Sequence, residues 1–241
     1  MYPDAVWSLS AIVAALVQAA PVTPRADERL MRGVSLERAG DLDGAREQFD
    51  AAVREHPEEW RAPMLRGQLV FRLGDNASAL ADFDRVVALK PDQEPYLWQR
   101  GISQYYEGRY EECAEQFVLH RTVNPDDVEN AVWHFLCVTK RDGVEAARAA
   151  ILPVGPDSRD PMPEVYRLFQ GDLAVADVMR AAGSSSSARF YGALYVGLYL
   201  EATGDLEAAL PYLRQAASAT VGGYMRDVAR LHVARLPKAT R

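Results

Sequence analysis

The stretch that decides the fold is the segment 60–93, which reads WRAPMLRGQLVFRLGDNASALADFDRVVALKPDQ. Five of its residues recur 34 positions before and after it, with a single exchange of one small residue for another. The five are Gly67, Gly74, Ala79, Phe83 and Pro91, preceded by Gly33, Gly40, Ala45, Phe49 and Pro57 and followed by Gly101, Gly108, Cys113, Phe117 and Pro125. A fixed period of this length predicts stacked helix–turn–helix units, because each unit buries its apolar face against its neighbours.

Each recurring residue type has a physical role in a helical hairpin. The first glycine lets the second helix approach closely, and the second glycine supplies the left-handed residue that ends the first helix. The small residue and the Phe lie four positions apart on one face of the second helix and fill the space within the pair. The proline stops that second helix. Asp41 and Asp75 directly follow the second glycine and are expected to be N-caps.

The period and these residues resemble the tetratricopeptide repeat (TPR). The resemblance implies an all-α fold, a right-handed TPR solenoid of helix–turn–helix repeats. Units are expected at 26–59, 60–93 and 94–127, with a degenerate unit at 128–152. An irregular loop and short helical insert are expected at 153–188, with the run GSSSS at 183–187 as a flexible link. Residues 189–236 are expected to form a TPR-like unit plus a C-terminal capping helix.

The composition excludes several functional classes. Apolar residues make up 49% and charged residues 25% of the 241 residues, as in ordinary globular proteins. Lys and Arg number 27 against 34 Asp and Glu, without a basic block, so nucleic-acid binding is not expected. Two cysteines exclude a disulfide-rich scaffold and a four-cysteine zinc finger. Catalytic and nucleotide-binding motifs are absent, so we expect no enzymatic activity, no cofactor and no metal.

The segment before the repeats predicts export. Ala5 to Ala19 is an uncharged, largely apolar run that is shorter than the roughly 20 residues a membrane span needs. Val17 and Ala19 are small enough to precede a cleavage site, so residues 1–19 are predicted to be a signal peptide and 20–25 a linker. The mature protein would be periplasmic or extracellular, with no stable membrane span. The alternative is an uncleaved apolar helix docked on the body of a cytoplasmic protein.

The order of features from residue 94 onward narrows the resemblance. Asn124-Pro125-Asp126-Asp127 leads into a helix that contains Trp133, and Gly204-Asp205-Leu206 forms the turn of the last repeat. This order looks like the bacterial new-lipoprotein-I class of TPR adaptors. The likeness implies a non-catalytic envelope protein that dimerises and holds a protease together with cell-wall hydrolases. The lipid-attachment cysteine of that class is missing here, so those partners are not carried over.

In a TPR array the first helices of the units line a concave groove. The repeat register places positions 2, 5, 9 and 12 of each unit there, which predicts partner-binding residues rich in rings, since rings offer large contact area at low entropy cost. The predicted residues are Met64, Gln68, Phe71, Trp98, Ile102 and Tyr105, with Trp133 beside them. Packing of these rings against neighbouring helices is the alternative. Leu30, Val34, Met64 and Gln68 occupy the positions of the carboxylate clamp of chaperone-type TPRs, so that clamp is absent.

Cys113 and Cys137 are predicted to lie level with each other on adjacent antiparallel helices, because the turn between them is centred near Asn124 to Asp127. In an exported protein this position favours a disulfide. Two reduced core thiols are the alternative. The spacing of both cysteines with His120 and His134 also permits a zinc site.

Together these features predict a non-catalytic TPR scaffold or adaptor in the cell envelope that binds a peptide or protein partner through its concave groove. The alternative is a homo-oligomeric structural assembly unit, in its simplest form a homodimer, whose contact is its own capping helix.

Overall fold

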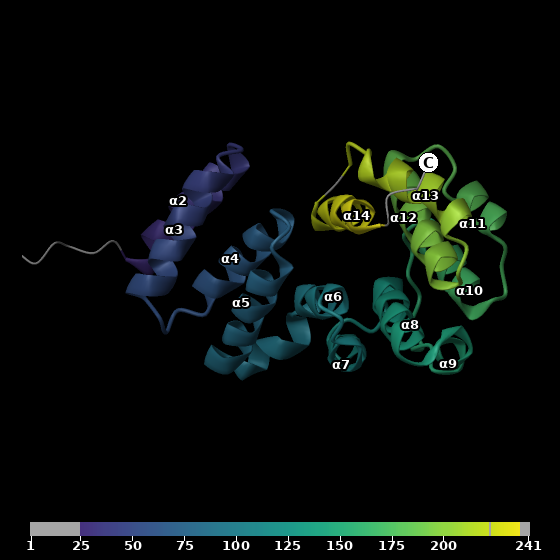
Figure 1. Cartoon of the computed structure of the whole chain (residues 1–241), viewed down its shortest axis with the longest axis horizontal. Coiled ribbons are helices and arrows are strands. Elements are labelled where there is room, and N and C mark those ends of the chain that lie inside the picture. Colours follow the sequence, from purple (N-terminus) through teal and green to yellow (C-terminus); the bar gives the residue numbers. More distant parts are fainter. Residues whose placement is uncertain (1–24, 222, 237–241) are drawn as a thin grey trace, which may run out of the picture.

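The computed structural model describes residues 25–221 and 223–236, and within these ranges the chain is helical with no strand. The predicted signal peptide, residues 1–19, lies outside the described residues. Figure 1 shows the helices following one another along a curved path, which confirms the expected all-α solenoid. The helices of the first half are α2 (Ala26–Arg38), α3 (Leu42–Glu55), α4 (Arg61–Arg72), α5 (Asn76–Leu89), α6 (Trp98–Tyr106) and α7 (Tyr110–Arg121). Those of the second half are α8 (Val128–Asp142), α9 (Val144–Ala149), α10 (Met162–Gln170), α11 (Val175–Ala181), α12 (Ser186–Ala202), α13 (Leu206–Ala217) and α14 (Tyr224–Arg235).

The first three units form the expected hairpins, in which α2 packs on α3, α4 on α5 and α6 on α7. The close approach at the first glycine is visible at Gly33, where an added Cβ would lie 2.4 Å from the ring of Phe49. The second glycine ends the first helix in the left-handed region, as at Gly40 with a φ of 86°. Asp41 and Asp75 are N-caps, as predicted, and accept hydrogen bonds from the backbone N–H of the residue three positions on.

The third unit begins differently from its expected position at residue 94. A short 3₁₀ helix, η1 (Pro91–Tyr96), lies between α5 and α6, so the first helix of this unit starts only at Trp98. Pro91 and Pro95 lack the backbone N–H that a longer α-helix requires, which explains the tighter segment.

In the second half, α8 is the most enclosed helix, because it contacts α7, α9, α10 and α12. The run predicted as a flexible link instead starts a helix, since α12 begins at Ser186. Ser185 is its N-cap and accepts a hydrogen bond from the backbone N–H of Ala188.

The loop before α10 belongs to the predicted irregular segment 153–188, and one arginine ties it to α8. The Arg159 guanidinium donates to Asp157 at 2.6 Å, to Asp127 at 2.5 Å and to Glu129 at 3.0 Å. The Tyr195 hydroxyl donates to the other oxygen of Glu129. Burial, reinforced by the neighbouring Asp127 carboxylate, raises the pKa of Glu129 above its ordinary value. This network fixes the insert against the N-terminus of α8.

The last helix does not simply cover the end of the array. It packs on α13 and also reaches α4, which belongs to the second unit. Figure 1 shows α14 (yellow) on the inner side of the curved molecule, facing α4 and α6. The predicted capping helix therefore covers part of the concave face, where a bound ligand had been expected.

Candidate partner-binding groove

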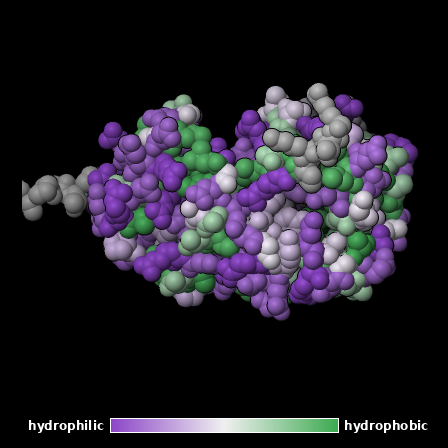
Figure 2. Space-filling model, in the orientation of Figure 1, coloured by the Kyte–Doolittle hydropathy of each residue, from purple (hydrophilic) through white to green (hydrophobic). Residues whose placement is uncertain are grey.

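The concave face has an open half, formed by α2 and α4. A cavity of about 660 Å³ lies there, and its apolar lining includes Leu30, Met31, Val34, Trp60, Met64 and Leu65. Met31 is 67% exposed, although its side chain is apolar. Figure 2 shows hydrophobic surface in the depression between the N-terminal repeats and the helices around α14. The open half is thus an accessible apolar surface on the face where the repeat register predicted a partner.

Charged groups border the open half, where Arg38 lines the cavity and Arg61 pairs with two carboxylates. The Arg61 guanidinium contacts Asp27 and Glu59, each at 2.7 Å. The hydrogen bonds from Arg61 lower the pKa of Glu59, and burial opposes this shift only in part. These pairs hold the start of α2 and the start of α4 together at one end of the cavity.

The rest of the concave face, the aromatic half, consists of Phe71, Trp98, Tyr105, Tyr106 and Trp133, and α14 covers it. Tyr224 of α14 inserts between two of these rings, stacked on Phe71 with centroids 4.8 Å apart and edge-on to Trp98 at 5.1 Å. Phe71 and Trp98 are two of the positions that the repeat register assigned to the groove. The first ring of α14 therefore occupies the place expected for a ligand.

Polar contacts also attach α14 to the concave face. Arg72 of α4 donates to Asp227 at 2.8 Å and also pairs with Glu37. His232 lies between the Tyr106 hydroxyl, at 3.1 Å from its Nδ1, and the carboxylate of Glu201, which contacts its Nε2. Burial opposes ionisation of Glu201, but the hydrogen bond and charge of His232, together with Lys140, lower its pKa. The Arg235 guanidinium lies 4.8 Å from the centre of the Tyr106 ring, a cation–π contact.

The structure corrects the expectation that the predicted rings are exposed. Phe71, Ile102, Tyr105 and Trp133 are all at most 6% exposed. Tyr105 is enclosed because Tyr110 and Trp133 pack on its ring, with centroids 5.8 and 5.6 Å away. Trp98 is half-buried against Tyr224, so the packing alternative holds for these residues in this structure. Their role in partner binding stays a prediction.

The two remaining predicted residues lie nearer the surface. Met64 lines the cavity of the open half. Gln68, one turn further along α4, lies beside Glu37, Arg72 and Tyr224 at the edge of α14. These two residues mark the boundary between the two halves of the groove.

Sequence reasoning missed the residues of α14 that contact the groove, namely Tyr224, Asp227 and His232. The signal was present, because Tyr224, Val228 and His232 are spaced by four and share one face of a helix. The sequence predicted this helix only as a cap, because nothing in the sequence indicates that the last helix returns to the second unit.

A second cavity, of about 330 Å³, remains beneath the start of α14. Its lining includes Trp98, Phe117, Trp133, Tyr191, Tyr224 and Met225. The indole N–H of Trp133 and the hydroxyl of Tyr224 are buried without a hydrogen-bond partner. Burial raises the pKa of Tyr224 well above its ordinary value, so the hydroxyl remains a donor. The helix that covers the aromatic half therefore leaves space and two donors unsatisfied.

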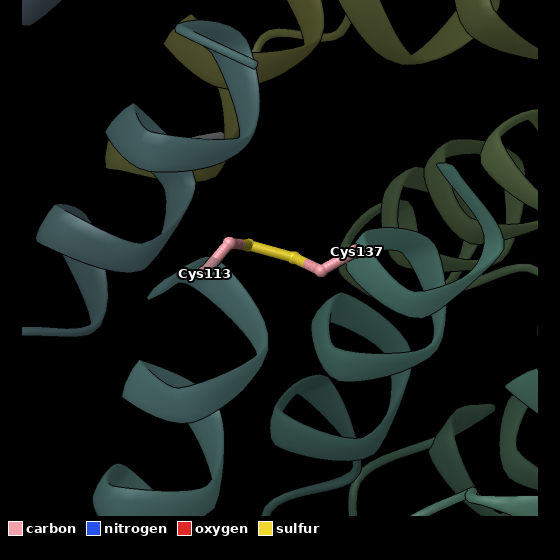
Figure 3. Close-up of a disulfide and its surroundings, with 2 residues drawn as sticks. All are labelled: Cys113 and Cys137. Atoms are coloured by element: carbon pink, nitrogen blue, oxygen red, sulfur yellow. A yellow bond between two sulfur atoms is a disulfide. The ribbon is translucent and has the colours of Figure 1, made fainter. Parts of the chain in front are cut away.

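Cys113 of α7 and Cys137 of α8 lie opposite each other with their Cα atoms 6.0 Å apart. Figure 3 shows the two side chains pointing toward one another and joined as a disulfide. Within the described part of the chain, no cluster of three or more His, Cys, Asp or Glu residues is placed to hold a metal ion. The oxidation state of the pair in the mature protein stays a prediction.

The chain is similar in sequence to known repeat-containing proteins. A family model described as the tetratricopeptide repeat matches residues 30–94. DnaJ homolog subfamily C member 3 of Mus musculus is 32% identical over 103 residues, which are 43% of this chain and 20% of that protein. The SGT1 homolog of Bos taurus is 27% identical over 103 residues, 43% of this chain and 30% of that protein. The chain thus spans less than a third of the length of these curated relatives.

Two solved structures share the fold over most of the chain. A tetratricopeptide repeat protein from Parabacteroides merdae has a TM-score of 0.57 at 16% identity and covers 92% of this chain and 90% of its own. PilW, described as a widely conserved type IV pilus biogenesis factor, has a TM-score of 0.51 at 17% identity and covers 84% of this chain and 97% of its own. At these identities the likeness shows the fold alone.

The stacked hairpins and the concave groove define an α-solenoid. Residues 30–94 match the tetratricopeptide-repeat family model, and the described chain as a whole has the fold of a tetratricopeptide-repeat solenoid. This fold generally serves as a non-catalytic scaffold for protein interactions. Within residues 25–221 and 223–236, no helix combines the length and the hydropathy needed to cross a membrane.

Proposed function

We propose that this protein is a non-catalytic adaptor that binds an apolar segment of a protein partner in the open half of its groove. The observation that carries the proposal is the 660 Å³ cavity of α2 and α4, which has an apolar lining and an exposed methionine at its rim. Exposed apolar surface rimmed by polar groups is typical of protein-binding sites. The cell envelope is its proposed location, on the basis of the apolar run at 5–19 and the resemblance to envelope adaptors.

The chemistry of the cavity indicates what such a segment contains. Leu30, Val34 and Met64 offer dispersion contacts, and the Arg38 side chain also lines the cavity. Arg61 is already paired with Asp27 and Glu59. A segment with two or three aliphatic or aromatic side chains, bound by burial of apolar area, fits this lining.

The test places a photoactivatable crosslinking residue at Met31 and identifies the captured protein from the native source. We then expect Val34→Asp to weaken binding of that protein at least tenfold, because a carboxylate in an apolar site loses hydration. Val118→Asp is the matched control, since Val118 is 46% exposed on α7 and does not line this cavity. Equal binding by wild type and Val34→Asp would reject the open half as the site.

The homo-oligomeric alternative loses its proposed contact in this structure. The capping helix that was expected to join two copies is packed against α4 and α13 of its own chain. Light scattering at increasing concentration tests this alternative, which requires a dimer.

A further inference from the structure

The helix α14 occupies the aromatic half as a bound ligand would. Its Tyr224 inserts between Phe71 and Trp98, its Asp227 pairs with Arg72, and its His232 contacts Tyr106. All four groove residues belong to α4 and α6, the first helices of their units. The contact thus consists of an amphipathic helix lying in a groove, which is a recurring mode of peptide recognition.

This occupant fits the groove incompletely. The 330 Å³ cavity beneath it borders both Met225 of α14 and the Trp133 ring. Trp133 and Tyr224 both line this cavity, and the Trp133 indole N–H and the Tyr224 hydroxyl are buried without partners. An unfilled cavity and unpaired buried donors both lower the stability of the contact. A helix with a larger residue and an acceptor at the position of Met225 would make contacts that α14 does not.

A short connection joins α13 to α14, and α14 packs on α13 as well as on α4. Helix α13 ends at Ala217, and α14 begins at Tyr224. Gly223, the N-cap of α14, has a φ of 70°, a conformation that glycine adopts readily. The fully buried apolar residues of α14 are Val228 and Ala229, and Met225 is 7% exposed.

We propose that α14 is a replaceable resident of the aromatic half, and that an amphipathic helix of a partner protein, with an aromatic residue where α14 has Met225, displaces it. The inference builds on the proposed adaptor function, but it concerns a different surface from the open half. Binding in the open half delivers the partner next to α14, because Met64 and Gln68 are neighbours along α4 and border the two halves.

The test uses the full chain and two fluorescent peptides. The first peptide is residues 223–236 of this protein, and the second is the same peptide with Met225→Tyr, which adds a ring to fill the cavity and an oxygen that can accept a hydrogen bond. The opened variant is Tyr224→Ala with Asp227→Asn. The matched control is Tyr96→Ala with Asp92→Asn, the same two changes on η1, where Tyr96 is 55% exposed.

We expect the opened variant to bind the first peptide at least tenfold more tightly than wild type or the control, and the second peptide at least fivefold more tightly than the first. Equal binding by the opened and control variants would overturn the proposal. A dimer of the opened variant in light scattering would also overturn it, since the groove would then accept α14 of a second copy.

Hydrogen exchange on the wild-type chain keeps the proposal testable if the opened variant does not fold. The amides of α14 are expected to exchange at least tenfold faster than those of α8, through local opening. If the amides of α14 exchange no faster than those of α8, then α14 leaves the groove only when the whole protein unfolds. This result would overturn the proposal. Val34→Asp separates the proposed binding in the open half from the proposed displacement of α14. It is expected to remove partner capture in the open half and to leave peptide binding by the opened variant unchanged.

Discussion

At the scale of single residues, burial decides the role and the protonation state of side chains whose function the sequence left open. His134 could have been a zinc ligand or a structural residue, and it is 6% exposed on α8 with its Nδ1 unpartnered. Burial, together with the positive charge of Arg141, lowers the pKa of His134 from 6.5 to about 4. A buried histidine of this kind stays neutral in the folded protein at neutral pH.

This lowered pKa predicts a loss of stability in mild acid. The unfolded chain binds a proton at His134 below pH 6.5, whereas the folded chain does so only near pH 4, so stability falls as the pH decreases between these values. We expect His134 to cost about 2 kcal/mol of unfolding free energy between pH 7 and pH 5. Urea titrations at both pH values measure it. His134→Leu should remove this part of the pH dependence, and an unchanged dependence in that variant would assign it to other groups.

Replacing Tyr105 and replacing Trp98 with alanine are expected to lower stability by different amounts, although the repeat register places both residues in the groove. Tyr105 is enclosed by Tyr106, Tyr110 and Trp133, so Tyr105→Ala should lower the unfolding free energy by about 3–5 kcal/mol, as for other buried rings. Trp98→Ala should cost less, because this ring is half-buried and packs edge-on against Tyr224 of the covering helix. Denaturant unfolding of both variants decides the order, and a larger loss for Trp98→Ala would contradict this account.

At the scale of helices, the spacing of recurring residues predicted the hairpins because each contact there is local. Gly33 and Phe49, for example, lie in consecutive helices, and the Phe49 ring occupies the space that a side chain at position 33 would need. The junctions were predicted less well. The proline pair of η1 and the N-cap at Ser185 each shift the start of a helix by a few residues from the repeat register.

The contact between α7 and α8 predicts a disulfide in the oxidised protein. Cys113 and Cys137 are 24 residues apart, and closing a loop of that size stabilises the fold by about 3 kcal/mol in the chain-entropy view. We expect mass spectrometry of unreduced, alkylated mature protein to show one bridge and no free thiol. Reduction should lower the melting temperature. Two alkylated cysteines in that sample would instead identify the pair as core thiols.

At the scale of the whole molecule, the solenoid has two surfaces for contact, one open and one covered by its own last helix. The open half begins near the start of the described chain, after the predicted signal peptide and linker. Export would place the groove and the cysteine pair in an oxidising compartment, where a disulfide persists.

Export predicts a specific N-terminus. The apolar run 5–19 ends in small residues, so cleavage after Ala19 should leave Ala20 and Pro21 at the start of the mature chain. N-terminal sequencing of protein from its native source measures this, with the cytoplasmic fraction as the control. A chain from the envelope fraction that still begins at Met1 would contradict the processing step.

The sequence by itself determined the repeating helical hairpins of this protein, their turns and the face of each first helix that lines the groove. These features depend on contacts between residues a few tens of positions apart, so a period of 34 residues expresses them directly. Only the tertiary structure decided what fills that groove. The pairing of Tyr224 with Phe71 joins positions 153 residues apart, and no local spacing encodes it. It depends on the accumulated curvature of all the intervening helices, because small rotations between units together bring α14 back to α4.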